Sequence, residues 1–145
     1  MKNLIPIVLS AVLLASCSTF KGKLTVQQTL SEKDKIVAAA NPAMRYLLTE
    51  DLKKKRVVIT DATVSDVIES LHIDYDFCVV VTMTVDANKV DCYLYSDDLK
   101  TISKLVKGST RIDAVGDFEK FFTLLDEKYT KIEVLDACID IKGGK

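Results

Sequence analysis

The segment CVVVTMTVDANKVDCYLY, residues 78–95, decides the fold. Two runs rich in β-branched and aromatic residues, 78–85 and 90–95, flank the stretch Asp86-Ala87-Asn88-Lys89. Asp and Asn favour tight turns, whereas the flanking residue types favour strands. The segment therefore predicts an antiparallel hairpin of two long strands.

Further strands are predicted on both sides of this hairpin. A β-branched run from Val57 to Ile68 precedes it, and residues 111–118 and 131–141 follow it with alternating apolar and polar side chains. Between the hairpin and these last two strands, residues 99–106 have apolar side chains at helical spacing. Gly108 follows them, as glycine often follows a helix. The predicted order is three strands, a short helix and two strands.

Two helical segments are expected ahead of the strands. Ser31 with Asp34 has the spacing of a capping box for the first, and Asn41-Pro42 predicts the N-cap and first turn of the second. The second segment has a stripe that we expect to face the core, namely Met44, Leu47, Leu48 and Leu52. The basic run at 53–56 that follows is interpreted as a solvated helix end; the alternative is contact with lipid phosphates.

The order of the strands is that of an OB-fold, and a family resemblance agrees with it. The stretch 55–141 resembles the tRNA-anti-like group of OB-fold lipoproteins, although Asp61-Ala62 stands where that pattern has glycine. The resemblance lies in the β-branched opening strand and in the segments 90–94, 105–108 and 132–139. It implies a mainly β protein, a five-stranded Greek-key barrel with N-terminal helices and a helix between strands 3 and 4.

One local pattern favours a different architecture. Phe118, Phe121, Phe122 and Leu125 have helical spacing, and Asp117 is available as an N-cap. If residues 118–125 were helical, the second half would read helix, strand, helix, strand. An α+β sandwich is therefore the alternative fold.

The N-terminus resembles the signal of a bacterial lipoprotein. Met1-Lys2-Asn3 is a short basic region, residues 4–13 are apolar over a secretory length, and Leu14-Ala15-Ser16-Cys17 matches a lipobox. The resemblance implies cleavage before Cys17, acylation of that cysteine and anchoring in a membrane, with Ser18 favouring the periplasmic face of the outer membrane. We expect residues 1–16 to be a signal peptide, 17–25 an acylated tether and 26–145 one OB-like domain with an N-terminal helical segment.

The remaining cysteines give one candidate disulfide. The third and fifth strands of an OB barrel are parallel neighbours, so Cys92 and Cys138 are the candidate pair, and Cys78 is expected to be a buried thiol. The spacings include no CxxC, and His72 is the single histidine, so no metal site is predicted.

The sequence favours binding over catalysis. It contains no Gly-x-Ser-x-Gly, HExxH, phosphate-loop or GxGxxG motif, so we predict neither an enzyme nor a cofactor. The formal net charge of −1 gives no electrostatic footprint for nucleic acid. We expect a lipid-anchored cell-envelope binding module that contacts a protein, peptide or glycan partner; the alternative is an immunity or exclusion-type envelope lipoprotein. The candidate binding face consists of Tyr75, Phe77, Tyr93 and Tyr95, because amphipathic rings dominate such surfaces.

Overall fold

A computed structural model describes residues 21–124 and 128–143. Cys17 and the expected signal peptide lie outside the described residues.

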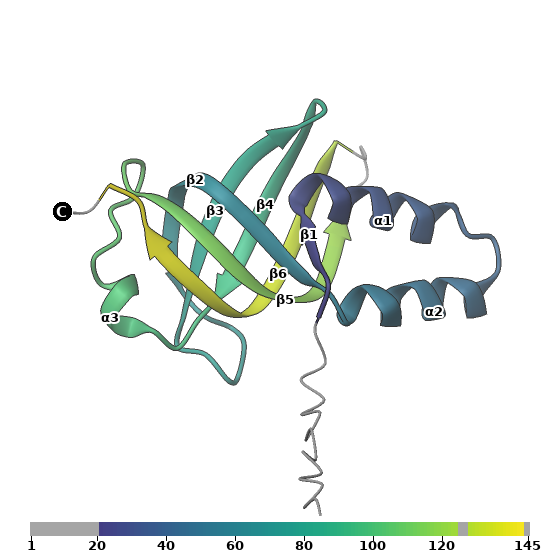
Figure 1. Ribbon diagram of the computed structural model, residues 1–145, viewed down its shortest axis with the longest axis horizontal. Coiled ribbons are helices and arrows are strands. Elements are labelled where there is room, and N and C mark those ends of the chain that lie inside the picture. Colours follow the sequence, from purple (N-terminus) through teal and green to yellow (C-terminus); the bar gives the residue numbers. More distant parts are fainter. Residues whose placement is uncertain (1–20, 125–127, 144–145) are drawn as a thin grey trace, which may run out of the picture.

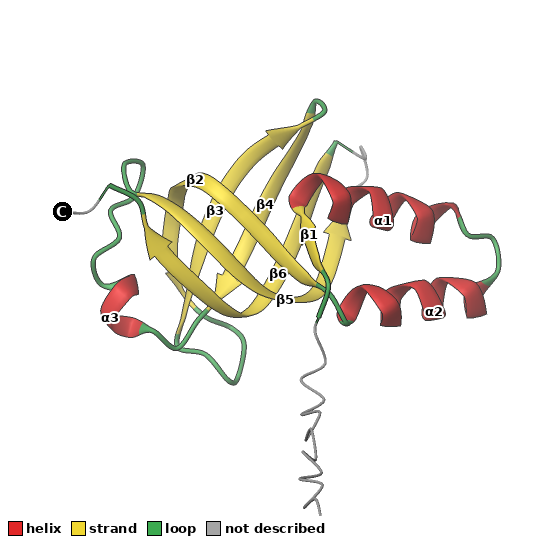
Figure 2. Ribbon diagram, in the orientation of Figure 1, coloured by secondary structure: helices red, strands yellow, loops and turns green. Residues whose placement is uncertain are grey.

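Five long strands form a closed barrel (Figures 1 and 2). Their order around the barrel is β2, β3, β4, β6 and β5, and β5 pairs with β2 to close it. β4 and β6 are parallel, and the other barrel pairs are antiparallel. The structure confirms the predicted mainly β, OB-fold-like barrel and excludes the α+β sandwich. The strands are β2 (Arg56–Glu69), β3 (Phe77–Val85), β4 (Asn88–Tyr95), β5 (Arg111–Thr123) and β6 (Tyr129–Ile141).

Branched aliphatic side chains from all five strands fill the barrel. Inward-facing residues alternate with outward-facing ones, so each strand contributes every second side chain to one core. The largest fully buried aliphatic side chains are Val57, Ile59, Val64, Val79, Val81, Val90, Leu94, Ile112, Ile132 and Val134.

Asp61 forms the bend in β2, at the position where the sequence resemblance led us to expect glycine. Its φ is 54°, and the register of β2 against β5 shifts between Ile59 and Ala62. The Asp61 N–H donates to Asp113 Oδ1 at 2.7 Å, and its carboxylate pairs with Arg111. Aspartate adopts this left-handed conformation more readily than most residues, so these partners hold a bend without glycine.

The helix suggested for residues 118–125 is wrong as far as the structure describes them, since β5 continues to Thr123. The register of β5 against β6 shifts between Phe118 and Lys120, which makes Glu119 an extra residue in the strand. Because of this bulge, Phe118 and Phe121 both pack against the core although they are three residues apart. A strand with a bulge can thus bury apolar residues three positions apart, a spacing that is otherwise typical of a helix.

A helical hairpin precedes the barrel. It consists of α1 (Val26–Ala38) and α2 (Pro42–Lys53). The predicted N-cap of α2 at Asn41 is confirmed, but α1 begins earlier than expected. Thr25 is its N-cap and forms a capping box with Gln28, so Ser31 lies inside the helix. The residues just before it, expected to end the tether, form the short strand β1 (Lys23–Thr25), which pairs with β2.

The stripe on α2 faces the core only at the root of the hairpin. Leu52 is buried and Leu48 half-buried, whereas Met44 and Leu47 are exposed. Figure 1 shows the reason: both helices project away from the barrel, so only their ends near β1 meet the strands. The helix expected between strands 3 and 4 is also shorter than predicted, with α3 spanning Leu99–Ile102.

Candidate functional site

The outward-facing surface of β3, β4 and β6 carries aromatic residues predicted for the binding face, together with charged side chains. Strand alternation turns Tyr93 and Tyr95 outward on β4, and Lys131 and Glu133 outward on β6. Parallel pairing places Tyr93 opposite Glu133. We call this surface the outer face.

The loop between β2 and β3, residues 70–76, covers one end of the outer face. The rings of His72 and Tyr75 lie 5.4 and 5.7 Å from the ring of Tyr95, and 5.2 Å from each other. These separations are typical of packed aromatic pairs. As a result, Tyr95 is only 6% exposed.

A bulge in β6 anchors this loop. The Tyr75 hydroxyl donates to Asp136 Oδ1 at 2.6 Å and accepts from the Asp136 N–H at 3.1 Å. Asp136 has a φ of 49° and lies where the register of β6 against β5 shifts. The same shift turns Leu135 outward, where it packs beside Tyr95, although alternation alone predicts it on the same side as Ala137.

A cavity of about 220 Å³ lies between the loop and the outer face. Leu71 and His72 line it from the loop, Tyr93 and Cys78 from the sheet, and Lys131 and Glu133 from β6. Lys120 of β5 and Glu69 at the end of β2 also line it.

Glu133 is the electrostatic centre of this cavity. It is 6% exposed and receives ion pairs from Lys131 at 3.1 Å and Lys120 at 3.5 Å. Lys131 Nζ also lies 4.0 Å from the centroid of the Tyr93 ring, a cation–π contact. A buried carboxylate requires such compensation. Glu69 also lines the cavity, so its two ammonium groups face two carboxylates and the charges of the lining balance.

The thiol of Cys78 and the phenols of Tyr75 and Tyr95 are held in their neutral forms. Burial raises the pKa of the Cys78 thiol to about 12, and burial likewise raises the pKa of Tyr95 to about 12. Burial, together with the hydrogen bond to Asp136, raises the pKa of Tyr75 to about 12. Since a thiol must ionise to act as a nucleophile, Cys78 is unsuited to that role.

His72 is hydrogen-bonded within the loop, so its Nδ1 is not free to act as a base. Its Nδ1 accepts from the Asp74 N–H at 3.3 Å, which in the neutral ring leaves the proton on Nε2. Among the described residues, no group of three or more His, Cys, Asp or Glu side chains is arranged to hold a metal ion.

The predicted binding-face residues occupy three different environments. Tyr93 lines the cavity, and Tyr75 holds the loop above it. Tyr95 lies on the outer face but is covered. Phe77 was placed wrongly: it packs against the barrel core, because it alternates with the outward-facing Cys78.

The predicted disulfide does not form. Cys92 pairs with Ile132 in the parallel ladder of β4 and β6, and Cys138 lies six residues further along β6. At about 3.3 Å per residue this separates the two cysteines by roughly 20 Å, too far for a bridge. Cys78, Cys92 and Cys138 are all free; the first two are buried and the third is exposed.

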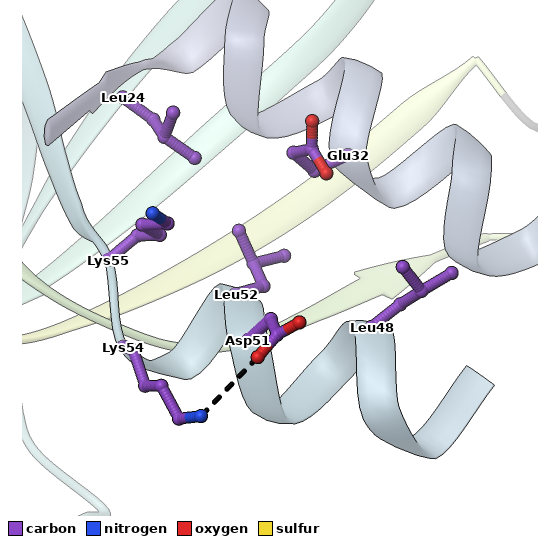
Figure 3. A pocket seen from close by; sticks show the side chains of 7 residues that line it. All are labelled: Leu24, Glu32, Leu48, Asp51, Leu52, Lys54 and Lys55. Carbon is purple, nitrogen blue, oxygen red and sulfur yellow. Dashed lines mark hydrogen bonds and ion pairs between the residues drawn. The ribbon is translucent and has the colours of Figure 1, made fainter. Parts of the chain in front are cut away.

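A larger cleft of about 550 Å³ lies at the root of the helical hairpin (Figure 3). Leu24, Leu48 and Leu52 form its apolar side. Its charged side chains partly neutralise one another, since Lys54 pairs with Asp51 at 3.3 Å. Figure 3 shows Lys55 pointing into this cleft from the chain that leaves α2.

Lys120, Lys131 and Glu133 were not among the residues predicted for the site. They come from β5 and β6, far along the chain from Tyr93, and only the register of the barrel brings them together. The outward alternation of Lys131 and Glu133 on the last strand was the available signal.

Comparison with known proteins adds no assignment. No family model matches the chain, and no curated protein matches it either. Among the described residues, no helix has the length and apolar character needed to cross a membrane.

Proposed function

We propose that this chain is a lipid-anchored binding module of the cell envelope, without catalytic activity, that holds a protein, peptide or glycan partner in the cavity on its outer face. The observation that carries the proposal is the buried Glu133 between two lysines, beside Tyr93 and under a loop that is already in place. Such a site is formed before its partner arrives, which reduces the ordering cost of binding.

The size and charge of the cavity define the group that fits. A volume of 220 Å³ corresponds to about seven waters at ~30 Å³ each, close to one sugar ring or one large side chain. The lysines and glutamates that line the cavity balance in charge and offer both hydrogen-bond donors and acceptors, which favours a polar, uncharged group. Sugar hydroxyls and amide side chains are such groups, and Tyr93 offers an apolar surface beside them.

The anchor is supported by the sequence, in which Leu14-Ala15-Ser16-Cys17 follows an apolar run of secretory length. Each buried methylene contributes about 0.8 kcal/mol, and one acyl chain binds a membrane only marginally. Acylation at more than one position of Cys17 would therefore hold the module at its membrane.

The anchor is tested by growing a lipoprotein-competent bacterium with labelled palmitate. The wild-type chain should take up the label and Cys17→Ser should not. Label that persists in the variant would remove the anchor.

The binding site is tested by capture from a detergent extract of the cell envelope, with the full acylated chain as bait and mass spectrometry as readout. Tyr93→Ala and Lys131→Gln should each lower recovery of the same partner by about tenfold, since an anchor residue contributes on the order of 1–2 kcal/mol. Lys142→Gln is the matched control, because Lys142 is a partly exposed lysine that pairs with Asp113 away from the cavity. Equal recovery by all four proteins would refute the site.

A further inference from the structure

The far end of the helical hairpin exposes several large apolar side chains. Residues 37–47, which run from the end of α1 through the connection into α2, include a single charged side chain, Arg45. Four large apolar or aromatic side chains in this stretch are between 50 and 65% exposed: Val37, Met44, Tyr46 and Leu47. We call these four residues the apolar tip.

This surface is unpartnered because of where the hairpin lies. Figure 1 shows α1 and α2 extending side by side beyond the barrel, with their connection at the point farthest from β1. The root of the hairpin buries Val26, Leu30 and Leu52. None of the strands that the structure describes lies beside the tip to cover it in the same way.

A second group of exposed apolar side chains differs from the apolar tip in the charges around it. Leu71 and Ile73, in the loop between β2 and β3, are fully exposed. Exposed carboxylates of Glu69, Asp74 and Asp76 surround them along the chain. Anionic lipid would repel that loop, whereas the only charge within the tip stretch is a cation.

Basic side chains at the hairpin root add to this difference in charge between the hairpin and the loop that joins β2 to β3. Lys21, Lys23, Lys53 and Lys54 are all exposed there. Three of them pair with carboxylates, Lys21 with Asp117, Lys53 with Glu50 and Lys54 with Asp51. Lys23 adds positive charge beside the tether. Cations near an anionic bilayer are attracted to it over about a Debye length.

The segment between Cys17 and β1 is long enough for the acylated cysteine and the apolar tip to reach the same membrane surface. α1 has 13 residues, so at about 1.5 Å per residue the tip lies about 20 Å from the root. Cys17 lies six positions before Lys23, and a chain of that length reaches at most about 20 Å. A cysteine held in the bilayer therefore permits the tip to touch the same surface.

We infer that the apolar tip of the α1–α2 hairpin lies in the interface of a phospholipid bilayer containing anionic lipid, and so fixes the orientation of the barrel on its membrane. This inference rests on the anchor proposed above. Tyr46 and Arg45 suit such a place, since an aromatic ring with a hydroxyl and a long cationic side chain both bridge apolar and polar layers.

Fluorescence in vesicles tests the inference. The chain has no tryptophan, so Tyr46→Trp and Leu71→Trp each introduce one reporter on an exposed site. The full chain, acylated in a lipoprotein-competent bacterium, is reconstituted in vesicles of phosphatidylethanolamine and phosphatidylglycerol. Some of the lipids are brominated on the upper part of the acyl chain and quench indole fluorescence.

The reporter at position 46 should shift to the blue and lose about half its intensity, because an interfacial helix buries its apolar face ~5–10 Å into the headgroup boundary. The reporter at position 71 should show neither change. Adding Met44→Ser and Leu47→Ser to the Tyr46→Trp chain should restore the intensity while the protein still floats with the vesicles.

Failure of the anchor and failure of the tip are distinguishable. Protein that does not float with vesicles removes the anchor and, with it, the inference. Protein that floats but shows no quenching at position 46, or equal quenching at positions 46 and 71, overturns the tip contact and leaves the anchor standing.

Discussion

Tyr75→Phe should loosen the loop that covers the outer face without disturbing the barrel. The change removes the hydroxyl that donates to Asp136 Oδ1 at 2.6 Å and accepts from the Asp136 N–H at 3.1 Å. It keeps the ring, and therefore the packing against His72 and Tyr95. Hydrogen bonds to charged groups contribute about 1.5–3 kcal/mol, and the exposure of Asp136 places this pair at the lower end. A loss of about 1.5 kcal/mol corresponds to about a tenfold higher population of the open loop.

Amide hydrogen exchange measures this opening residue by residue. The N–H of Asp136 loses its acceptor, and the N–H of Ser70, which donates to Asp76 at the neck of the loop, reports opening. Exchange at both should accelerate about tenfold, while the amides of β3 and β4 should not change. Tyr46→Phe is the control, because that tyrosine lies on the distant hairpin. Unchanged exchange at Ser70 in Tyr75→Phe would show that the Tyr75 hydroxyl does not hold the loop.

Three further predictions concern the barrel itself. Gly116→Ala should lower the free energy of unfolding by about 3 kcal/mol in urea titration, since its Cβ would lie 2.5 Å from Val134 Cγ1; Gly22→Ala should have little effect, because it meets only the end of a flexible lysine. In the native protein Cys138 should react with a thiol reagent at once, and the two buried cysteines only after unfolding. Because folding raises the pKa of Tyr95 from 10.0 to about 12, its contribution to stability is complete below pH 10 and is lost as the pH rises through 12. The urea midpoint should therefore fall over that range, and a constant midpoint would contradict the burial of this phenol.

The fold was predictable because it depends on long, regular segments. The β-branched runs at 57–68, 78–85 and 90–95 form strands close to their predicted limits, and Asn41 begins α2 as its side chain indicates. In each case local preference and burial in the barrel point to the same structure. That agreement is what makes the strand order readable from the chain.

The errors arose where one residue changes the register. The bulge at Glu119 lets two phenylalanines share a face at helical spacing, and the bulge at Asp136 turns Leu135 outward. Single insertions of this kind leave little signal in the sequence, because the residue types around them are ordinary for strands.

The candidate site was predictable only in part, for the same reason. Tyr93 was recognised from its own strand, but Lys131 and Glu133 join it through the pairing of β4 with β6. The error over Cys92 and Cys138 has the same origin: the two strands are neighbours as expected, but the register separates the cysteines. Strand order can be inferred from local patterns, whereas register depends on bulges and on packing across the whole barrel.

Site-specific photo-crosslinking in living cells shows whether the cavity on the outer face holds a partner. A photoreactive amino acid replaces Tyr93 in the cavity or, as the control, Lys142 away from it, in the full chain with Cys17 intact. We expect irradiation to join one envelope component to the chain through position 93 and not through position 142. Lys131→Gln should lower the amount of this crosslinked product. Irradiation that gives no product at position 93, or the same products at both positions, would contradict a binding site on the outer face.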